Sequence, residues 1–259
     1  MGEYSLSERD GHLFVITINR PEAMNALHPM ANTELSELVD EFQSDPELWV
    51  AIITGAGDRA FSAGNDLKFQ AGAGGERPKH PETGFAGLTN RWDLNKPVIA
   101  AVNGVAMGGG FEIALACDLI IASDNARFAL PEPKVGLAAL AGGIHRLPRQ
   151  IGMNRAMGMM LTGRHVSAGE GRDLGFVNDV VAQVELMDRA REWASMILAC
   201  SPMSIRATKE AAYGGLDHAA LREAYSARYP AVQAMIDSED FVEGPKAFAE
   251  KRAPEWKGR

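Results

Sequence analysis

The sequence predicts an α/β protein in which a β-rich first part is followed by a helical last third. Continuous apolar runs rich in β-branched residues, typical of buried strands, lie at residues 13–19, 50–55, 98–102 and 119–122. From residue 147 onward, apolar residues recur mostly at helical spacing. The chain has 259 residues, 46% of them apolar, which is ample for one large core and leaves room for a smaller appended domain.

The first predicted strand, Leu13 to Asn19, ends at Arg20-Pro21, because a residue that precedes proline disfavours the helical conformation. A loop over residues 20–27 then leads to a helix that begins at Met30 and stops at Asp45-Pro46. Its apolar positions at helical spacing are Leu35, Leu38, Val39 and Phe42. The strand Val50 to Gly55 follows, so that strand, helix and strand imply parallel pairing with a right-handed crossover.

A tight turn with exposed amides is predicted from Ala60 to Lys68, because small residues dominate this stretch. The Ala63 N–H is a candidate donor to an oxygen that becomes negatively charged. A plain strand-end turn, in which Asp66 caps the next helix, is the alternative, and Asp66 can have that role in either case. Ser62 is expected to be structural.

Residues 71–84 form the most loop-like part of the chain, with four glycines and two prolines. A long loop beside a binding site is commonly a lid or a specificity element. Phe69, Phe85 and Trp92 border this loop and either form a pocket wall or belong to the ordinary core.

The most informative stretch runs from Pro97 to Gly143. It opens with the strand Val98 to Val102, which is bounded by Asn103-Gly104, and continues through Gly108, Gly109 and Gly110 into an apolar helix over 111–116. Bare glycine amides at a helix N-terminus attract an anion or a carbonyl oxygen that is becoming one. A further strand is expected over 119–122.

Two carboxylates flank this glycine-rich turn. Glu112 lies in the first turn of the predicted helix, and Glu132 lies between Pro131 and Pro133, twenty residues later. That separation allows one helix, one strand and a return to the same edge, so both carboxylates can face one pocket. Carboxylates beside oxyanion-binding amides suit proton transfer next to a carbonyl. The alternatives are a solvated Glu112 that favours the helix dipole and an exposed loop residue at Glu132.

Helical periodicity dominates the rest of the chain, with one short strand at 176–181. The expected helices span residues 147–161, 168–174, 184–200, 203–213, 216–236 and 241–252. Cys117 and Cys200 have no disulfide or metal spacing and are interpreted as small core residues.

The composition and several incomplete motif matches argue against a number of functions. A net charge of −8 and a pI near 5.3 argue against a nucleic-acid groove. No leader and no apolar run near 18 residues is found, so a soluble, cytoplasmic protein without membrane contact is expected. Ile113 breaks a dinucleotide fingerprint and Ala60 a nucleophile elbow, while no P-loop lysine follows the glycines. The six histidines are scattered singly, which predicts no metal site.

Three groups of residues, in order and spacing, resemble the enoyl-CoA hydratase (crotonase) family. They are Phe61-Ser62-Ala63-Gly64-Asn65-Asp66-Leu67, Gly108-Gly109-Gly110-Phe111-Glu112, and Leu130-Pro131-Glu132-Pro133 with Val135-Gly136 and Gly142-Gly143. Weaker matches extend from Arg20 to the carboxyl end, so the resemblance covers nearly the whole chain. Within the family, the stretches 84–89 and 94–97 resemble the crotonobetainyl-CoA (carnitinyl-CoA) hydratases.

The resemblance implies a crotonase-like (ClpP/crotonase) spiral of β-β-α units with a C-terminal helical trimerisation region. We expect residues 1–195 to form the spiral core with the catalytic site. Residues 196–259 are expected to form the helical region for oligomerisation and for covering coenzyme A. Subunits of this kind form homotrimers, often paired into hexamers. The methionines at 153, 157, 159 and 160 suit such contacts, and irregular core packing explains them equally well.

The resemblance also assigns a reaction and a site. It implies hydration of a trans-2-enoyl-CoA, with the amides of Ala63 and Gly109 on the thioester oxygen and with Glu112 and Glu132 as acid and base. No cofactor is implied, since coenzyme A is part of the acyl-CoA substrate. The residues expected along the substrate are Ala23, Asn25, Ala26, Ala63, Gly64, Asn65, Asp66, Leu67, Gly109, Phe248 and Lys251. A basic residue such as Lys251 also suits a helix C-terminus without any ligand.

Three alternatives remain at this stage. A crotonobetainyl-CoA hydratase is the same chemistry on a charged acyl group. A Δ3,Δ2-enoyl-CoA isomerase needs one carboxylate and no water. A non-catalytic RNA-binding relative is the alternative from another class, and the acidic pI disfavours it.

Overall fold

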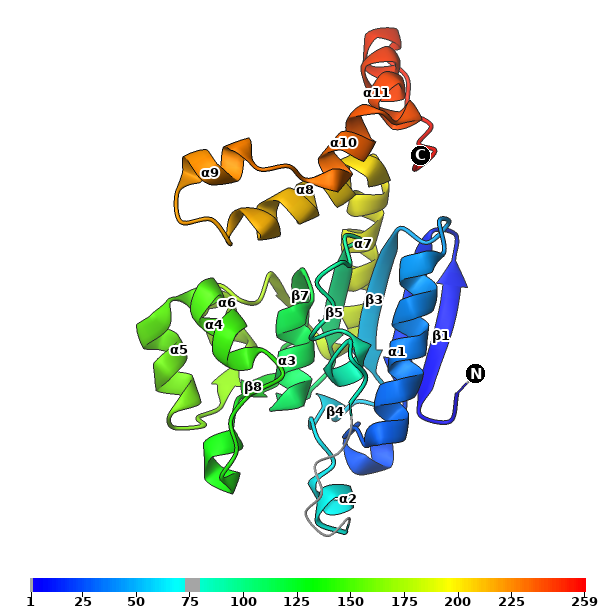
Figure 1. The fold of residues 1–259 in the computed structure, drawn as a ribbon. Coiled ribbons are helices and arrows are strands. Elements are labelled where there is room, and N and C mark those ends of the chain that lie inside the picture. The colour runs from blue at the N-terminus through cyan, green and yellow to red at the C-terminus, as the bar shows by residue number, and fades with distance from the viewer. Residues whose placement is uncertain (1, 73–79) are drawn as a thin grey trace.

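The computed structural model describes residues 2–72 and 80–259, and a six-stranded sheet forms its centre (Figure 1). The strand order is β1–β2–β3–β5–β7–β10, and only the β1–β2 pair is antiparallel. The strands are β1 Ser5–Asp10, β2 Leu13–Ile18, β3 Val50–Gly55, β5 Val98–Val102, β7 Leu119–Ser123 and β10 Asp179–Val181. The predicted parallel pairing of β2 with β3 is confirmed. Strand β1 was not predicted, because its polar sequence carries no apolar signal at this sheet edge.

A smaller sheet of four short strands lies beside it, in the order β4–β6–β8–β9. The strands are β4 Ala60–Ser62, β6 Val105–Met107, β8 Arg127–Ala129 and β9 Val166–Ser167. Strands of three residues or fewer show no readable alternation, and none of the four was predicted as a strand. This sheet matters for function because β4 leads into the turn at Ala63 and β6 leads into Gly108.

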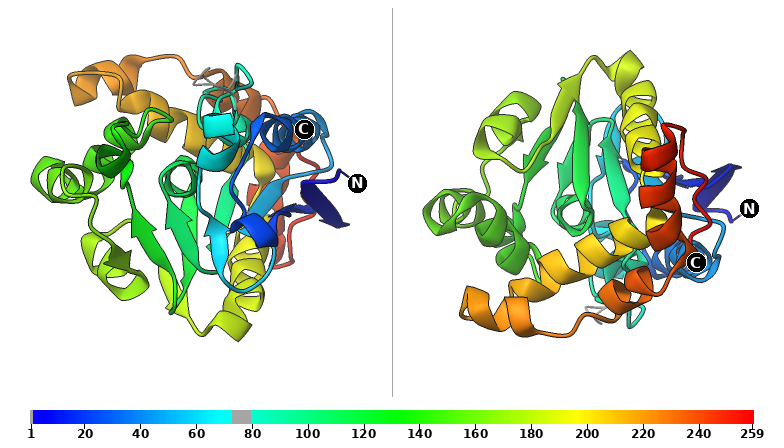
Figure 2. Two further views of the ribbon diagram at one scale, coloured as in Figure 1. Left: turned by 90° about the horizontal axis from the view of Figure 1, so that it is seen from below. Right: turned by 90° about the horizontal axis from the view of Figure 1, so that it is seen from above.

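Helices cover both faces of the main sheet (Figures 1 and 2). On one face lie α1 Pro29–Ser44, α3 Gly109–Ala116 and α4 Gly143–Ile151, and on the other lies α7 Leu186–Leu198. Side chains alternate along β2, so that Phe14 and Ile16 join the core under α1, while Leu13 and Val15 join the core under α7. The remaining short elements are α2 Leu67–Gly72, α5 Met153–Met160, α6 Ala168–Leu174, η1 Pro21–Ala23, η2 Phe85–Gly87, η3 Glu132–Val135 and η4 Gln183–Glu185.

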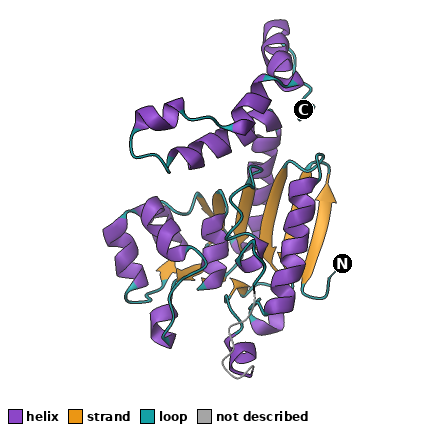
Figure 3. Cartoon of the chain, viewed as in Figure 1, coloured by secondary structure: helices purple, strands orange, loops and turns teal. Residues whose placement is uncertain are grey.

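The C-terminal part is helical and extends away from the sheets (Figure 3). It comprises α8 Pro202–Gly215, α9 Leu221–Ser226, α10 Pro230–Ile236 and α11 Glu239–Glu250. Lys209 Nζ of α8 lies 2.7 Å from Asp118 Oδ2 and 2.8 Å from the Lys96 carbonyl oxygen, which fastens this part to the core. In the described ranges, no helix combines the length and the apolar character needed to cross a membrane.

Two predicted helices are each broken in two. The helix expected over 147–161 is α4 and α5, because Gly152 between them has a φ of 82°. The helix expected over 216–236 is α9 and α10, because the residues before Pro230 leave the helical conformation. Cys117 is buried as expected, whereas Cys200 is exposed, so its assignment to the core is wrong.

Candidate active site

Both predicted carboxylates lie near the N-terminus of α3, Glu112 within the helix and Glu132 in a separate segment. Glu112 is 4% exposed, and its Oε1 accepts a hydrogen bond from the Gly143 amide at 2.9 Å. Glu132 begins η3, and a Cβ added to Gly108 would lie 3.0 Å from Glu132 Oε1. Glu132 therefore reaches the residue that immediately precedes α3. As predicted from their separation of twenty residues, the two side chains lie near each other, at the start of α3.

The two carboxyl groups have different hydrogen-bond environments. Burial raises the pKa of Glu112 to about 7; the Gly143 amide opposes that rise, and the nearby Glu132 adds to it. Burial also raises the pKa of Glu132. Its Oε2 is buried and has no hydrogen-bond partner in the described part of the chain. A buried oxygen without a partner is costly in a folded protein, which marks Glu132 as a group kept for a ligand.

The Gly109 amide opens α3 and faces the same place. Gly108 adopts φ 53° and ψ −124°, a conformation that favours glycine, and this lets β6 turn sharply into the helix. As the first helical residue, Gly109 has no partner for its N–H within the helix. Among the described residues it donates to no other acceptor. This amide is therefore available to a ligand oxygen.

The second predicted donor, Ala63, is already bonded. Its N–H donates to the Met24 carbonyl oxygen at 2.9 Å, so the prediction that this amide is free is wrong. The Gly64 N–H donates to Ser62 Oγ at 3.1 Å. Ser62 Oγ in turn donates to the Asn25 carbonyl oxygen, which fits the structural role expected for this serine.

The next amide, that of Asn65, has no acceptor among the described residues. Asn65 forms a parallel bridge with Leu27, in which the Leu27 N–H donates to the Gly64 oxygen and the Asp66 N–H donates to the Leu27 oxygen. In such a bridge the N–H of the middle residue points the other way. A Cβ added to Gly64 would lie 2.7 Å from the Gly109 nitrogen, so the 64–65 peptide lies beside α3. The two amides available here are those of Asn65 and Gly109.

The loop expected to follow coenzyme A is held against this turn. Asn25 is fully buried and its side chain is used internally: Oδ1 accepts from the Arg20 N–H, and Nδ2 donates to the Ala56 and Ala60 carbonyl oxygens. Arg20 Nη1 lies 3.0 Å from Asp66 Oδ2. Asp66 Oδ1 also accepts from the Phe69 N–H and caps α2, which Leu67 begins.

The structure brings most of the predicted substrate residues together. Ala23 ends η1, and Ala26, Gly64 and Asn65 lie along the Leu27 bridge. Phe248 and Lys251, by contrast, lie at α11, which is at the opposite end of the molecule from α2 (Figure 1). Phe248 is 88% exposed.

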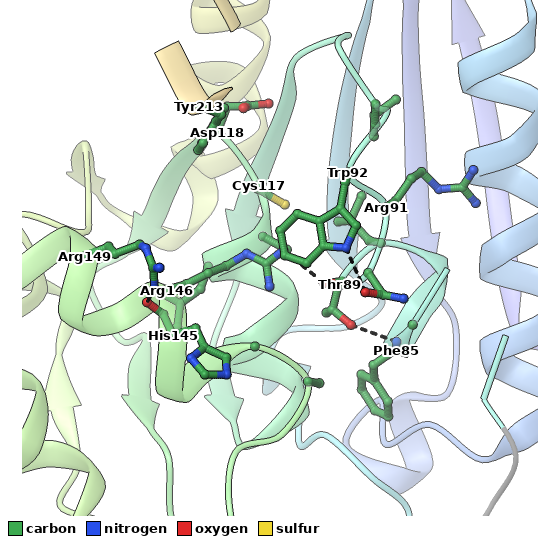
Figure 4. A pocket seen from close by; sticks show the side chains of 18 of the residues that line it. Phe85, Thr89, Arg91, Trp92, Cys117, Asp118, His145, Arg146, Arg149 and Tyr213 are labelled. Atoms are coloured by element: carbon green, nitrogen blue, oxygen red, sulfur yellow. Dashed lines mark hydrogen bonds between the residues drawn. The ribbon is translucent and has the colours of Figure 1, made fainter. Parts of the chain in front are cut away.

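A cavity of about 1210 Å³ lies beside the site, and neither Glu112 nor Glu132 is among the described residues that line it. Its lining includes Asn65, Gly142, which precedes the amide that bonds Glu112, and Phe85, together with Trp92, Arg146 and Tyr213 (Figure 4). Phe85 and Trp92 thus form a wall, as one of the two interpretations expected, whereas Phe69 is 40% exposed and is not among the lining residues described. Of the predicted lid over residues 71–84, residues 73–79 lie outside the described residues.

Sequence reasoning missed three contributors to the site. The Asn65 amide was passed over because only pairing with Leu27 shows which amide of the turn is unbonded. Gly143 and Arg146 received no role, although a glycine pair before a helix was a usable signal of exposed amides. Over residues 2–72 and 80–259, no three His, Cys, Asp or Glu side chains are grouped so as to hold a metal ion, and the absence of a metal stays a prediction.

Comparison with known proteins gives consistent matches over the whole length. Residues 8–259 match the family described as enoyl-CoA hydratase/isomerase. The chain is 48% identical to the carnitinyl-CoA dehydratase of Escherichia coli (strain K12), covering 97% of each protein. Its fold superposes on the crystal structure of an enoyl-CoA hydratase from Mycobacterium tuberculosis H37Rv with a TM-score of 0.92 at 38% identity, and on a carnitinyl-CoA hydratase from Mycobacterium avium with a TM-score of 0.78 at 41% identity. Both structural matches cover 100% of each chain.

Proposed function

Since this chain belongs to the enoyl-CoA hydratase/isomerase (crotonase) family and has its predicted spiral α/β fold, we propose that it catalyses the reversible addition of water to a trans-2-enoyl-CoA, giving a 3-hydroxyacyl-CoA. The observation that carries the proposal is the buried Glu112 and the partly buried Glu132 beside two amides that have no acceptor among the described residues. An acyl-CoA thioester is thus the expected partner, and no cofactor is required beyond this substrate.

In the proposed mechanism, the thioester oxygen accepts hydrogen bonds from the amides of Gly109 and Asn65. These donors stabilise the negative charge that moves onto oxygen and so make the β-carbon electrophilic. The Asn65 amide takes the place first assigned to Ala63, whose N–H is bonded to Met24. The 2.7 Å approach between a Cβ added to Gly64 and the Gly109 nitrogen supports a shared oxygen.

Glu112 serves as the base and Glu132 as the acid. The Gly143 amide favours the ionised form of Glu112, which takes a proton from water as the oxygen bonds to the β-carbon. Burial favours the protonated form of Glu132, which donates its proton to the α-carbon. In the dehydration direction the same groups act in reverse order, with Glu132 removing the α-proton and Glu112 protonating the leaving hydroxyl group.

A second candidate substrate is crotonobetainyl-CoA, whose hydration gives carnitinyl-CoA. The identity of 48% to the carnitinyl-CoA dehydratase of Escherichia coli supports it. The stretches 84–89 and 94–97 point the same way, and Phe85, Leu88 and Thr89 of the first stretch line the cavity. An isomerase needs only one proton-transfer group, so the presence of a second, partly buried carboxylate favours hydration over isomerisation.

A panel of enoyl-CoA esters, including crotonyl-CoA and crotonobetainyl-CoA, tests the proposal through loss of the conjugated-thioester absorbance. We expect hydration of at least one ester and a loss of roughly 10³-fold in kcat for Glu132→Gln, which keeps the shape but cannot supply the proton. A 3-enoyl-CoA that gains absorbance would instead indicate an isomerase. No turnover of any ester, or wild-type turnover by a folded Glu132→Gln variant, would overturn the proposal.

We also propose a homotrimer or a hexamer as the functional assembly. Large exposed apolar side chains on the outer helices support it, among them Met153, Leu161, Leu221 and Phe248. Because α11 lies far from the site of its own chain, Phe248 and Lys251 are proposed to cover the coenzyme A of a neighbouring subunit.

A further inference from the structure

Arg146, which lines the cavity, has an unusual environment. It lies in the first turn of α4, where the helix dipole disfavours a positive charge. It is partly buried, and its Nη1 is buried without a hydrogen-bond partner among the described residues. Residues that break local rules in this way commonly serve function rather than stability. A compensating negative charge is therefore expected nearby.

The guanidinium joins the two walls of the site. Its Nη2 donates to the Thr89 carbonyl oxygen at 2.9 Å, and its Cζ lies 5.0 Å from the centroid of the Trp92 ring. Figure 4 shows this side chain extending from α4 to the segment that carries Thr89 and Trp92. Thr89 Oγ1 also accepts a hydrogen bond from the Phe85 N–H, and the Phe85 ring packs against Gly109. Arg146 is thus linked through Thr89 to the residue that packs against the Gly109 amide.

The other end of the guanidinium lies against the turn that holds Glu112. A Cβ added to Gly142 would lie 2.0 Å from Arg146 Nη1, and the next residue, Gly143, donates its amide to Glu112. A Cβ on Gly143 would lie 3.1 Å from Glu112 Oε1. The Gly142–Gly143 turn therefore contacts the guanidinium through Gly142 and the carboxylate through Gly143. Arg146 is thus close enough to favour the ionised form of Glu112 electrostatically.

Few other charges face Glu112. The segments β4, β6 and η2, which pack against α3, contain no ionisable side chain. Glu132 of η3 adds a second negative charge. The remaining charged residues of α4 are His145 and Arg149, which are both exposed.

We infer that Arg146 is a positioning residue for Glu112: it fastens the Gly142–Gly143 turn to Thr89 and supplies the positive charge that keeps the carboxylate ready to accept a proton. The inference concerns how the proposed base is held and so rests on the proposed function.

Carboxyl-carbon NMR titration tests this without any substrate. Protein labelled with [5-¹³C]glutamate is titrated as wild type, Arg146→Gln, Arg146→Lys and Arg149→Gln, and the Glu112 signal is assigned by its absence in Glu112→Gln. Arg149 is the matched control, because it is an arginine one turn later on the same helix whose Nη1 donates to the His145 carbonyl oxygen and to no other described residue. We expect Arg146→Gln to raise the Glu112 midpoint by about 0.5–1 pH unit. The control is expected to leave it unchanged, and Arg146→Lys to move it less than half as far as Arg146→Gln.

Kinetics supply the second readout. In Arg146→Gln the acidic limb of the kcat profile should move to higher pH by a similar amount, so that most of the lost rate returns at high pH while KM changes little. A chain that hydrates no enoyl-CoA would refute the proposed function, but the NMR titration would still decide the role of Arg146.

Three results would overturn the inference: a wild-type Glu112 midpoint in Arg146→Gln, an equal shift in Arg149→Gln, or equal shifts in Arg146→Gln and Arg146→Lys. If Arg146→Gln does not fold, the double variant Glu112→Gln/Arg146→Gln should recover the fold, because it also removes the uncompensated carboxylate. Failure of that double variant to fold would assign Arg146 a purely structural role and reject the inference.

Discussion

Glu112 and Glu132 carry the same carboxyl group, but their hydrogen-bond environments differ, which supports the opposite roles proposed for them. Glu112 is nearly inaccessible but accepts an amide hydrogen bond that favours its charge. Glu132 has a buried oxygen without a partner, an environment that favours the protonated form. Burial raises the pKa of both groups, to about 7 for Glu112, so the two groups differ in their hydrogen bonds and not in the direction of the pKa shift. The proposed division of roles therefore rests on the amide that Glu112 accepts and on the lack of a described partner for Glu132 Oε2.

Glu112 should make the protein less stable as the pH rises. Its pKa is about 7 in the folded chain and about 4.5 in the unfolded one, so the folded state binds more protons between these values. The free energy of unfolding should therefore fall as the pH rises from about 4.5 to 7 and stay level above. Glu112→Gln removes this loss and should be more stable than wild type at pH 8 by about 1–3 kcal/mol.

Urea unfolding at pH 5 and pH 8 measures this difference. The exposed Glu37→Gln variant on α1 serves as the control and should follow the wild-type pH dependence. An equal gap between wild type and Glu112→Gln at both pH values would show that the ionisation of Glu112 is not its source.

Replacing single amides by esters separates the two candidate oxyanion donors. An ester in place of the Asn65 N–H removes a donor to the thioester oxygen and should lower kcat by roughly 10²- to 10³-fold. An ester at Ala63 removes the hydrogen bond to the Met24 oxygen and should cost about 1 kcal/mol of stability with little loss of kcat. A large loss of kcat for the ester at Ala63, with little loss for the ester at Asn65, would instead identify Ala63 as the oxyanion donor.

At the scale of elements, the site depends on how closely α3 approaches β4. A Cβ on Gly110 would lie 2.0 Å from the Ser62 carbonyl oxygen, and one on Gly64 would lie 2.6 Å from the Met107 oxygen. Both contacts are with backbone atoms, which cannot rotate aside. The glycines therefore let a helix N-terminus and a strand end approach closely enough for amides of both to meet one ligand oxygen.

Gly110→Ala should disrupt this approach. We expect a loss of about 2–4 kcal/mol in the free energy of unfolding and loss of nearly all activity, because the backbone of α3 or β4 must shift. Gly158→Ala is the matched control: Gly158 lies inside α5 with no atom within 4 Å of an added Cβ. It should be neutral or stabilising by about 0.5–1 kcal/mol. Chemical denaturation of both variants checks the pair, and similar losses would refute the explanation.

At the scale of the whole molecule, the C-terminal helices are anchored at one end and exposed elsewhere. Lys209, Asp118 and the Val98 amide form a partly buried network between α8 and the main sheet. Beyond it, Leu221 and Tyr225 of α9 are 87% and 90% exposed. Large apolar side chains so exposed are typical of surfaces that other chains cover.

The assembly should therefore exceed one chain. Light scattering after size exclusion is expected to give three or six times the chain mass of 27.9 kDa. Leu221→Glu should reduce that mass, because it places a charge on a surface proposed to be covered. Leu137→Glu, at a residue that lines the cavity, should leave the mass unchanged. A mass near 27.9 kDa at micromolar concentration would contradict the proposed trimer.

The sequence by itself determined the elements whose signal is local and long. β3 and β5 have the predicted bounds, and α1 differs by one residue at each end, because apolar periodicity and flanking prolines or glycines define such elements. It also pointed to both carboxylates and to Gly109, since glycines before an apolar helix and a glutamate between prolines are visible without tertiary information.

Only the tertiary structure decided which groups are available to a ligand. Whether an amide of the 63–65 turn is unbonded depends on Met24 and Leu27, which lie almost forty residues earlier in the chain. Likewise, the pKa of Glu112 depends on burial, which raises it, and on the Gly143 amide, more than thirty residues later, which lowers it. Local sequence sets backbone conformation, but hydrogen-bond satisfaction and burial are set by segments that meet only on folding.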